Sequence, residues 1–280
     1  MGIMEEKDDI ATTAIPQEPG SESRRPLMLI TNDDGIFAKG IRELVKALRP
    51  YGEIVVVAPD KPQSGRGHAV TLDAPLWYMV SKFDDADRAY KCTGTPSDCV
   101  KIALYRIMDR KPDLIISGIN HGSNSSVNIL YSGTMGAAME GAIHGIPSIG
   151  FSLLIFNSDA DFAAAALYAA RITAKTIENL GSLPFTCLNV NIPCLPESEI
   201  KGVRVVRQGK GEWIEDFVRH FHPSNKRPYY WLTGGFHDLE PESTDTDTWM
   251  LDNGYITVQP VTVDCTDYAA LKSMGEGWFD

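Results

Sequence analysis

Two adjacent carboxylates follow the first long apolar run of the chain. Asn32-Asp33-Asp34-Gly35 comes directly after the apolar residues at 27–30. Neighbouring carboxylates repel each other and burial favours their neutral forms, so a cation between them removes a conflict. Divalent cations such as Mg²⁺ and Ca²⁺ prefer carboxylate oxygens. The run taken alone also fits an ordinary Asx turn, because Asn, Asp and Gly are turn formers. Loops further along the chain favour the cation site.

Two of these loops are predicted to meet the carboxylate pair. Helical spacing of apolar residues predicts a helix over 39–49, and β-branched or apolar runs predict buried parallel strands at 53–58 and 113–117. In such sheets the ligand lies outside the carboxyl ends of the strands. Ser64 and Asn120 lie in the loops expected there. Carboxylate, hydroxyl and amide oxygens form a set for Mg²⁺, Ca²⁺ or Mn²⁺ rather than zinc, with positions left for water and phosphate.

A fourth loop has the composition of an anion site. Tyr131-Ser132-Gly133-Thr134 opens a helix of small residues predicted over 135–144. A glycine lets the backbone approach a ligand, and a helix N-terminus presents free N–H groups and a positive dipole. The same residues also fit a simple Ser or Thr helix cap. Beside an acidic metal cluster, the anion site is favoured and suits phosphoryl transfer.

The rest of the pattern predicts an α/β fold with a looser, aromatic end. Thr95 and Pro96 mark a helix start, with Thr as the cap and Pro in the first turn. Further strands are predicted at 69–72, 76–80, 147–151, 187–192, 229–232 and 255–258, the first two as a hairpin, with helices over 161–180 and 266–274.

Composition excludes several classes of protein. The 280 residues carry a net charge of -11 without a basic block, which disfavours broad binding to duplex nucleic acid. No apolar run reaches membrane-spanning length, so we expect no membrane partner. Five cysteines, without a Cys-x-x-Cys, predict buried thiols in a reducing cytoplasm. Residues 1–25 are polar and acidic and are predicted to form a disordered extension.

Several motifs together resemble the SurE family of stationary-phase survival nucleotidases. The similarity covers roughly residues 27 to 268. The matching runs are Leu-Ile-Thr-Asn-Asp-Asp-Gly-Ile at 29–36, Ala-Pro-Asp-Lys-Pro-Gln-Ser-Gly at 58–65, Ser-Gly-Ile-Asn-His-Gly-Ser-Asn at 117–124 and Tyr-Ser-Gly-Thr-Met-Gly-Ala-Ala at 131–138, with weaker matches at 94–100 and 254–258.

The resemblance implies roles for particular residues. By this likeness the metal ligands, which also form the catalytic set, are Asp33, Asp34, Ser64 and Asn120. The residues that hold phosphate and line the site are Asn32, Gly35, Ser132, Gly133 and Thr134. One divalent ion, Mg²⁺ or Mn²⁺, is implied per subunit. Ser125-Ser126 departs from a less polar pair usual in the family, but touches no implied ligand.

The predicted activity is a metal-dependent phosphomonoesterase acting on nucleoside monophosphates. The 5′ and 3′ phosphates and short polyphosphate all remain open as substrates, as do the base and the physiological metal. Activated water is favoured over a covalent aspartyl-phosphate because both carboxylates are committed to the metal. The alternative is a non-catalytic nucleotide sensor with the same pocket. A dinucleotide cofactor is disfavoured, since the first strand-to-helix turn lacks Gly-x-Gly-x-x-Gly.

Other chemically capable residues have two interpretations each. His68 could contact substrate or cap a carbonyl, and His121 could support the metal site or simply pack. For Arg66 a solvated side chain is favoured over a phosphate contact. His220 and His222 could suggest zinc, but an ordinary loop is favoured, because no acidic partner is fixed nearby. Aromatic residues at 229–231 and Trp249 could stack a base, but an interface is favoured.

The resemblance also implies a domain plan and an assembly. It predicts a Rossmann-like catalytic domain over 26–202, with a parallel-core sheet flanked by helices, and a C-terminal extension over 203–280. The strands at 229–232 and 255–258 would form a two-stranded ribbon, which is marginally stable alone. The family exchanges this extension with a partner subunit, so a homodimer or a tetramer is expected. The alternative is a monomer whose ribbon folds back.

Overall fold

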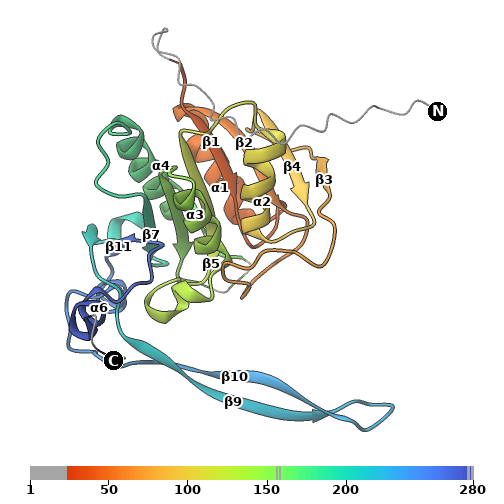
Figure 1. Cartoon of the computed structure of the whole chain (residues 1–280), viewed down its shortest axis with the longest axis vertical. Coiled ribbons are helices and arrows are strands. Elements are labelled where there is room, and N and C mark those ends of the chain that lie inside the picture. Colours follow the sequence, from red (N-terminus) through yellow and green to blue (C-terminus); the bar gives the residue numbers. More distant parts are fainter. Residues whose placement is uncertain (1–23, 156, 158, 276–277, 279–280) are drawn as a thin grey trace.

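A nine-stranded sheet forms the body of the molecule, with the strand order β3-β4-β2-β1-β5-β6-β7-β11-β8 (Figure 1). The computed structural model describes residues 24–155, 157, 159–275 and 278. The strands of this sheet are β1 (Leu27–Thr31), β2 (Glu53–Pro59), β3 (Tyr78–Val80), β4 (Arg88–Cys92), β5 (Leu114–His121), β6 (Ser148–Leu153), β7 (Cys187–Ile192), β8 (Val203–Val205) and β11 (Ile256–Val261). The helices are α1 (Lys39–Leu48), α2 (Pro96–Ile102), α3 (Gly133–Ile143), α4 (Ala163–Glu178), α5 (Asp247–Asp252) and α6 (Tyr268–Met274).

The centre of the sheet is parallel and contains a topological switch point. Strands β4, β2, β1, β5, β6 and β7 pair in parallel, whereas β3 and β11 run antiparallel to their neighbours β4 and β7. The chain leaves β1 toward β2 on one side and later returns to β5 on the other side. Ligands in such sheets bind where the strand order reverses, outside the carboxyl ends of the strands. The ends of β1 and β5 are therefore the expected place for a site.

Alternation along the strands builds two cores, one on each face of the sheet. In β1, Met28 and Ile30 face the core that contains the apolar stripe of α1 and the small residues of α4. Leu27 and Leu29 face the other core, with residues of α2 and α3. Helices thus cover both faces (Figure 1). The predicted parallel-core α/β sheet flanked by helices is confirmed. Within the described residues, no helix is long and apolar enough to cross a membrane.

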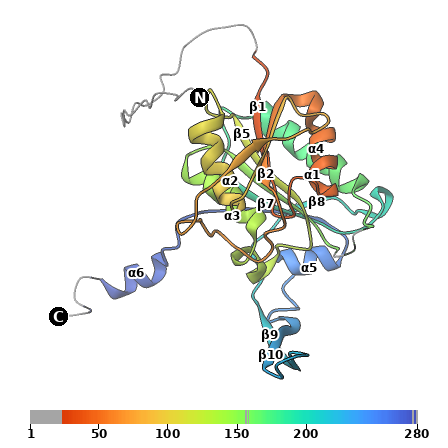
Figure 2. The same cartoon turned by 90° about the vertical axis from the view of Figure 1, so that its right-hand side faces the viewer.

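Local signals explain where the helices begin. The helix α2 starts with a capping box, in which Thr95 and Asp98 each bond the other's backbone N–H, and Pro96 occupies the first turn as predicted. Ser132 accepts a hydrogen bond from the Met135 N–H and caps α3. The predicted helix over 266–274 is confirmed as α6, which Asp267 caps and which extends away from the sheet (Figure 2).

Three predictions about strands are wrong. Residues 69–72 form no strand, and β3 pairs instead with β4, which the sequence reading missed. In β4, whose sequence is Arg-Ala-Tyr-Lys-Cys, only Ala89 and Cys92 are buried, and they face opposite cores, so neither a continuous apolar run nor an alternation marks the strand. The loop expected from residue 118 begins later, because β5 continues to His121. Asn120 therefore lies on a strand, after an irregularity in the pairing with β6.

The two-stranded ribbon exists, but with a different partner strand. It consists of β9 (Gly211–Phe221) and β10 (Pro228–Asp238), which form a hairpin that projects from the body (Figure 1). Residues 229–232 lie within β10, as predicted, but 255–258 belong largely to β11 in the main sheet. Charged residues interleave with apolar ones in β9 and hide the strand in the sequence. Since β8 and β11 also join the sheet, the domain division at residue 202 stays a proposal.

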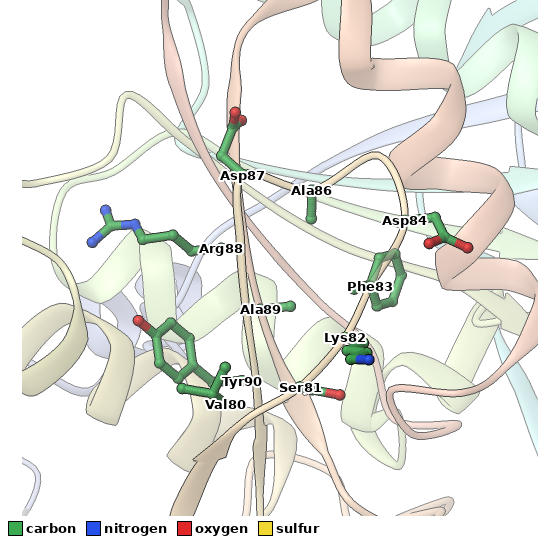
Figure 3. Close-up of a pocket in the computed structure, with 10 residues that line it drawn as sticks. All are labelled: Val80, Ser81, Lys82, Phe83, Asp84, Ala86, Asp87, Arg88, Ala89 and Tyr90. Atoms are coloured by element: carbon green, nitrogen blue, oxygen red, sulfur yellow. The ribbon is translucent and has the colours of Figure 1, made fainter.

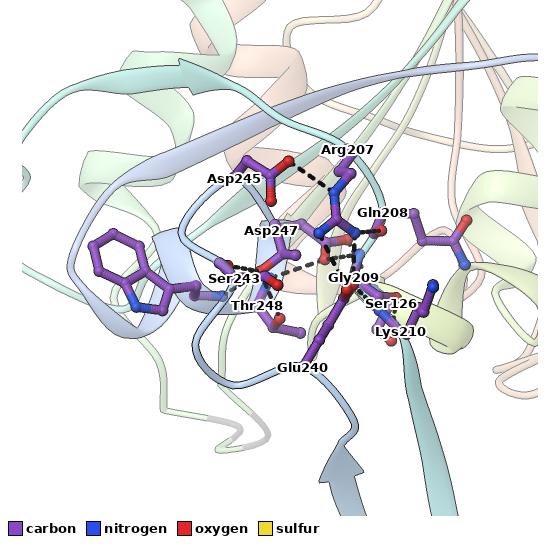
Figure 4. Close-up of polar contacts among 12 residues, drawn as sticks. Ser126, Arg207, Gln208, Gly209, Lys210, Glu240, Ser243, Asp245, Asp247 and Thr248 are labelled. Carbon is purple, nitrogen blue, oxygen red and sulfur yellow. Dashed lines mark hydrogen bonds and ion pairs between the residues drawn. The ribbon is translucent and has the colours of Figure 1, made fainter.

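Buried hydrogen bonds and surface ion pairs anchor the base of this hairpin (Figure 4). The Asp247 side chain is fully buried and accepts hydrogen bonds from the N–H groups of Ser126 and Gly209, at 2.8 Å each. Arg207 pairs with Glu240 at 2.6 Å and with Asp245 at 2.8 Å. Ser126, the departure noted in the sequence, thus ties the hairpin base to the segment that follows β5. Of the predicted extension at 1–25, residues 1–23 lie outside the described residues.

Candidate active site

The carboxylate pair lies in a tight turn at the end of β1. Asn32 and Asp33 are buried, and the side chain of Asp34 is 17% exposed. The Asn32 side-chain amide donates to the Gly35 carbonyl at 2.9 Å and closes the turn. Gly35 has φ +95°, a conformation that residues with a Cβ rarely adopt. The geometry of the turn therefore accounts for Asn32 and Gly35. It does not account for the two adjacent carboxylates, which a bound cation would explain.

The N-terminus of α3 lies against Asp33. The Thr134 hydroxyl donates to Asp33 Oδ1 at 2.5 Å. A Cβ added to Gly133 would lie 2.9 Å from the Asp33 Cβ and 3.3 Å from Pro96 Cγ, so only glycine fits between them. The sequence predicted Pro96 only as part of a helix start and not as a neighbour of the site, although its segment is one of the weaker family matches. Thr134 was predicted to line the phosphate site, and the structure places its hydroxyl on the metal-ligand candidate Asp33.

The end of β5 meets Asp34. The His121 N–H and its ring Nδ1 each lie 3.2 Å from Asp34 Oδ2. Asn120 donates its side-chain N–H to the Gly122 carbonyl at 2.8 Å, so the Oδ1 of the same amide points away from Gly122. Among the described residues no donor reaches that Oδ1, so it is available to a cation. His121 also packs edge-on against Phe162, with 4.9 Å between ring centroids. His121 therefore contacts the ligand candidate Asp34 and also packs against Phe162.

The loop after β2 brings Ser64 beside the pair. The Gln63 N–H donates to the Asp33 backbone carbonyl at 2.7 Å, and the Ile36 N–H donates to the Pro59 carbonyl at 2.8 Å. These bonds fix the loop to the turn that carries the carboxylates. Ser64 itself, the next residue after Gln63, is exposed. All four predicted ligands therefore lie on segments that meet at the switch point of the sheet.

Electrostatics in this site favour a cation. Burial raises the pKa of Asp33 to about 6, and the neighbouring charge of Asp34 adds to the increase, while hydrogen bonds from Thr134 oppose it. The Oδ1 of Asn32 is buried without a hydrogen-bond partner in the described structure. A cation here removes the repulsion between the carboxylates and compensates for desolvation. The donors are all oxygens, which fits Mg²⁺ or Mn²⁺ better than zinc.

The other residues weighed in the sequence lie elsewhere. His68 Nε2 pairs with Glu140 at 2.9 Å, and Arg66 is exposed. His220 lies on the hairpin and stacks on Tyr229, with 5.6 Å between ring centroids. Within the part of the chain that the structure describes, no three His, Cys, Asp or Glu side chains gather as a metal cluster.

A hollow of about 450 Å³ at the edge of the sheet is separate from this site. Figure 3 shows its lining, which consists of residues between Val80 and Tyr90 around the connection from β3 to β4. This connection precedes β4, whereas the carboxylate pair lies beyond the carboxyl ends of β1 and β5. Asp87 in its wall is already paired with Arg49 at 2.5 Å. The candidate site is therefore the open polar surface at the switch point and not this hollow.

Comparisons with known proteins agree with this geometry. The family model described as "Survival protein SurE" matches residues 28–215. A protein of Bacteroides thetaiotaomicron named 5′-nucleotidase SurE is 51% identical over 253 residues, covering 90% of this chain and 96% of that protein. A Flavobacterium johnsoniae protein of the same name is 50% identical over 254 residues, covering 90% and 97%.

A solved structure supports the same relationship. The crystal structure of the SurE protein from Aquifex aeolicus superposes with a TM-score of 0.75 at 41% sequence identity. The match covers 89% of this chain and 98% of that chain. Since the family model matches most of the chain and the relatives are matched along almost their whole length, the chain belongs to the SurE family.

Proposed function

We propose that this protein is a 5′-nucleotidase, a phosphomonoesterase that hydrolyses nucleoside monophosphates with the help of a divalent cation. The observation that carries the proposal is the convergence of Asp33, Asp34, Ser64 and Asn120 at the switch point, beside the N-terminus of α3. The relatives that bear the name 5′-nucleotidase SurE support the reaction class. Hydrolysis of 3′-nucleotides and of short polyphosphate is included as a proposal, since the open site sets no evident limit on the leaving group.

One Mg²⁺ or Mn²⁺ per subunit fits the residues present. The carboxylates of Asp33 and Asp34, the Ser64 hydroxyl and the Asn120 Oδ1 would hold it. A bound cation of this kind polarises a phosphoryl oxygen and lowers the pKa of water. Thr134 holds the Asp33 carboxylate in place, and the Gly122 carbonyl sets the orientation of the Asn120 amide. The site is thus preorganised by residues that do not themselves bind the ion.

The chain supplies the remaining functions through the turn after β1 and the start of α3. The Gly133 N–H and the Ser132 hydroxyl lie at a helix N-terminus, where donors favour the charge on phosphate oxygens. Asn32 and Gly35 shape the turn below them. Asp34 Oδ2 faces His121, while Oδ1 has no donor among the described residues, so we assign to Oδ1 the proton from the attacking water.

A covalent aspartyl-phosphate is the competing enzymatic route. It requires a carboxylate oxygen free to attack phosphorus. The Asp33 carboxylate is buried and accepts a hydrogen bond from Thr134. Asp34 Oδ2 contacts His121, and Asp34 Oδ1 is the oxygen to which we assign the proton of the water, so we favour water as the nucleophile. A phosphorylated peptide that contains Asp33 or Asp34, recovered from an acid-quenched reaction, would overturn the choice of water as nucleophile.

Phosphate release tests the function directly. Purified protein is incubated with adenosine 5′-monophosphate and Mn²⁺ or Mg²⁺, and inorganic phosphate is compared with a chelated sample. Release that depends on the metal and disappears in Asp33→Asn supports the nucleotidase. Binding of the nucleotide without release would favour the alternative, a nucleotide sensor with the same pocket. The 3′-monophosphate and tripolyphosphate in parallel samples decide the wider substrate range.

We also propose that the hairpin β9–β10 assembles subunits into a homodimer or a tetramer. Large apolar side chains remain exposed on both of its faces: Trp213 is 43% exposed, Phe217 58%, Trp231 63% and Leu232 60%. In an antiparallel pair, opposed residues share a face, so Phe217 and Leu232 lie together on one face and Val218 and Trp231 on the other. An isolated ribbon of this kind is marginally stable, and a second subunit would cover it.

The mass in solution tests the assembly. Light scattering at micromolar concentration should give a dimer or a tetramer, and Trp231→Glu should shift the mass toward the monomer because a charge enters the covered face. A monomeric wild-type protein with full phosphatase activity would contradict the proposed assembly but not the proposed reaction. The cytoplasmic location predicted from the cysteine pattern stays a proposal. All five cysteines are free thiols, but the prediction of buried thiols is wrong for Cys194 and Cys265, which are exposed.

A further inference from the structure

A buried carboxylate, Glu140 on α3, contacts one lysine and two histidine side chains. Its Oε2 lies 2.9 Å from His68 Nε2, and its Oε1 lies 2.6 Å from Lys101 Nζ on α2 and 3.1 Å from His144 Nε2 just beyond α3. The Glu140 side chain is only 2% exposed, whereas those of His68, Lys101 and His144 are 31%, 41% and 25% exposed. None of these residues belongs to the set that meets at the switch point.

Glu140 remains charged although it is buried. Burial by itself would raise its pKa, but hydrogen bonds and charge from His68 and Lys101 outweigh that effect and hold the pKa at about 2. A buried carboxylate is costly unless its partners satisfy it. An apolar residue at this position of α3 would avoid the cost, so the charge indicates a purpose beyond packing. His68 is the partner that belongs to the loop of the predicted ligand Ser64.

This loop reaches α3 by close contacts along its length. The Gly67 N–H donates to the Tyr131 carbonyl at 3.0 Å, just before α3. A Cβ on Gly136 would lie 2.5 Å from the Gly67 carbonyl oxygen, so the loop rests on the first turns of the helix. His68 then binds Glu140 one turn further along. Ser64 lies between this contact and the Gln63–Asp33 hydrogen bond.

We propose that Glu140 is a positioning residue, which through His68 holds the Ser64 loop against α3 and thereby sets the affinity of the site for its divalent cation. The inference rests on the proposed function, because it takes Ser64 as a ligand of that cation. Glu140 touches neither the ligands nor the substrate. Glu140 acts through the loop at 63–68, which carries the proposed ligand Ser64 near its start and the Glu140 contact of His68 at its end.

Direct measurement of cation binding tests this role without catalysis. Mn²⁺ is titrated into protein free of metal and substrate, and the electron paramagnetic resonance signal of unbound Mn²⁺ gives the dissociation constant. Glu140→Gln and His68→Ala should each weaken Mn²⁺ binding about tenfold, the effect typical of residues that orient ligands. His68 is partly exposed, so its truncation leaves the core intact and decides the matter even where Glu140→Gln lowers stability.

Matched variants distinguish the effect of a displaced Ser64 loop from the effect of removing any partner of Glu140. Lys101→Gln and His144→Gln remove the other partners of the same carboxylate but leave His68 in place. They should change Mn²⁺ affinity by about threefold or less, as expected for partly exposed pairs. The double variant His68→Ala/Glu140→Gln should be no more than about twofold weaker than Glu140→Gln, since both changes break one interaction.

The outcomes of this experiment are distinct. Wild-type affinity in His68→Ala, or an equal loss in Lys101→Gln and Glu140→Gln, would overturn the positioning role. Failure of the proposed function has another signature: the wild-type protein binds Mn²⁺, and His68→Ala weakens that binding, but no phosphate is released from any nucleotide. Absence of Mn²⁺ binding by the wild-type protein would overturn both.

Discussion

Replacing Asp33 by Asn should make the metal-free protein more stable while it removes the activity. The Asp33 carboxylate is buried beside Asp34, and its pKa is raised from 3.8 to about 6, first by burial and then by the neighbouring charge. Asparagine has the same shape, carries no charge and can still accept the hydrogen bond from Thr134. The substitution thus removes the destabilising charge without creating a cavity.

The size of the effect follows from the pKa. One pKa unit corresponds to about 1.4 kcal/mol, so a rise from 3.8 to about 6 costs the folded state about 3 kcal/mol once Asp33 is ionised. Between these two pH values the folded protein binds more protons at Asp33 than the unfolded chain. The free energy of unfolding therefore falls as the pH rises through this window, and the full cost is present above it. The advantage of Asp33→Asn should be about 3 kcal/mol at neutral pH and vanish near pH 3.8.

Urea unfolding in the presence of a chelator measures this advantage at equal protein concentrations. The expected result is a higher free energy of unfolding for Asp33→Asn at neutral pH and a smaller difference at acidic pH. Added Mn²⁺ should stabilise the wild-type protein but not the variant. As a control, Asp84→Asn makes the same chemical change at an exposed position and should stay within about 0.5 kcal/mol. A variant that is no more stable than the wild-type protein, or a gain in stability that does not depend on pH, would show that the buried charge of Asp33 does not destabilise the folded protein.

Three further predictions concern the ligands and the hairpin. Ser64→Ala should keep more activity than Asp33→Asn at saturating metal, because water can replace a neutral hydroxyl; equal losses of phosphate release would refute this ranking. Gly133→Ala should fold but bind Mn²⁺ poorly, since its Cβ would lie 2.9 Å from the Asp33 Cβ, whereas Gly181→Ala, with open space around it, should bind normally. Asp247→Ala should lose about 2–4 kcal/mol of unfolding free energy in urea, because buried backbone N–H groups lose their acceptor; an unchanged midpoint would count against the anchoring role.

The central sheet could be predicted from the sequence because its strands are covered on both faces. The strands β1 and β2 are nearly continuous apolar or β-branched runs, and the spacing in α1 marks its buried stripe. The short strand β4 buries only Ala89 and Cys92 and places charged residues between and before them, which explains why it was missed. The hairpin strand β9 is exposed on both faces and mixes charged with aromatic residues, so neither a continuous run nor a clean alternation marks it.

The sequence predicted which loops meet at the site but not the side-chain contacts that hold them together. Motif positions and the rule for parallel sheets were enough to bring Asp33, Ser64 and Asn120 to one end of the sheet. The contact between Thr134 and Asp33 joins residues 101 positions apart, and that between His68 and Glu140 joins residues 72 apart. No local pattern encodes such pairs. An acidic residue within a helix of small apolar residues was the one available signal for Glu140, and it was not used.

The position of a bound cation is the most direct test of the proposed metal site. Crystals grown with Mn²⁺ and measured at its absorption edge give an anomalous difference peak wherever the ion binds. We predict one strong peak per subunit, in contact with the carboxylates of Asp33 and Asp34, the Ser64 hydroxyl and the Asn120 Oδ1. A peak elsewhere, or none at this end of the sheet at a concentration that supports phosphate release, would contradict it.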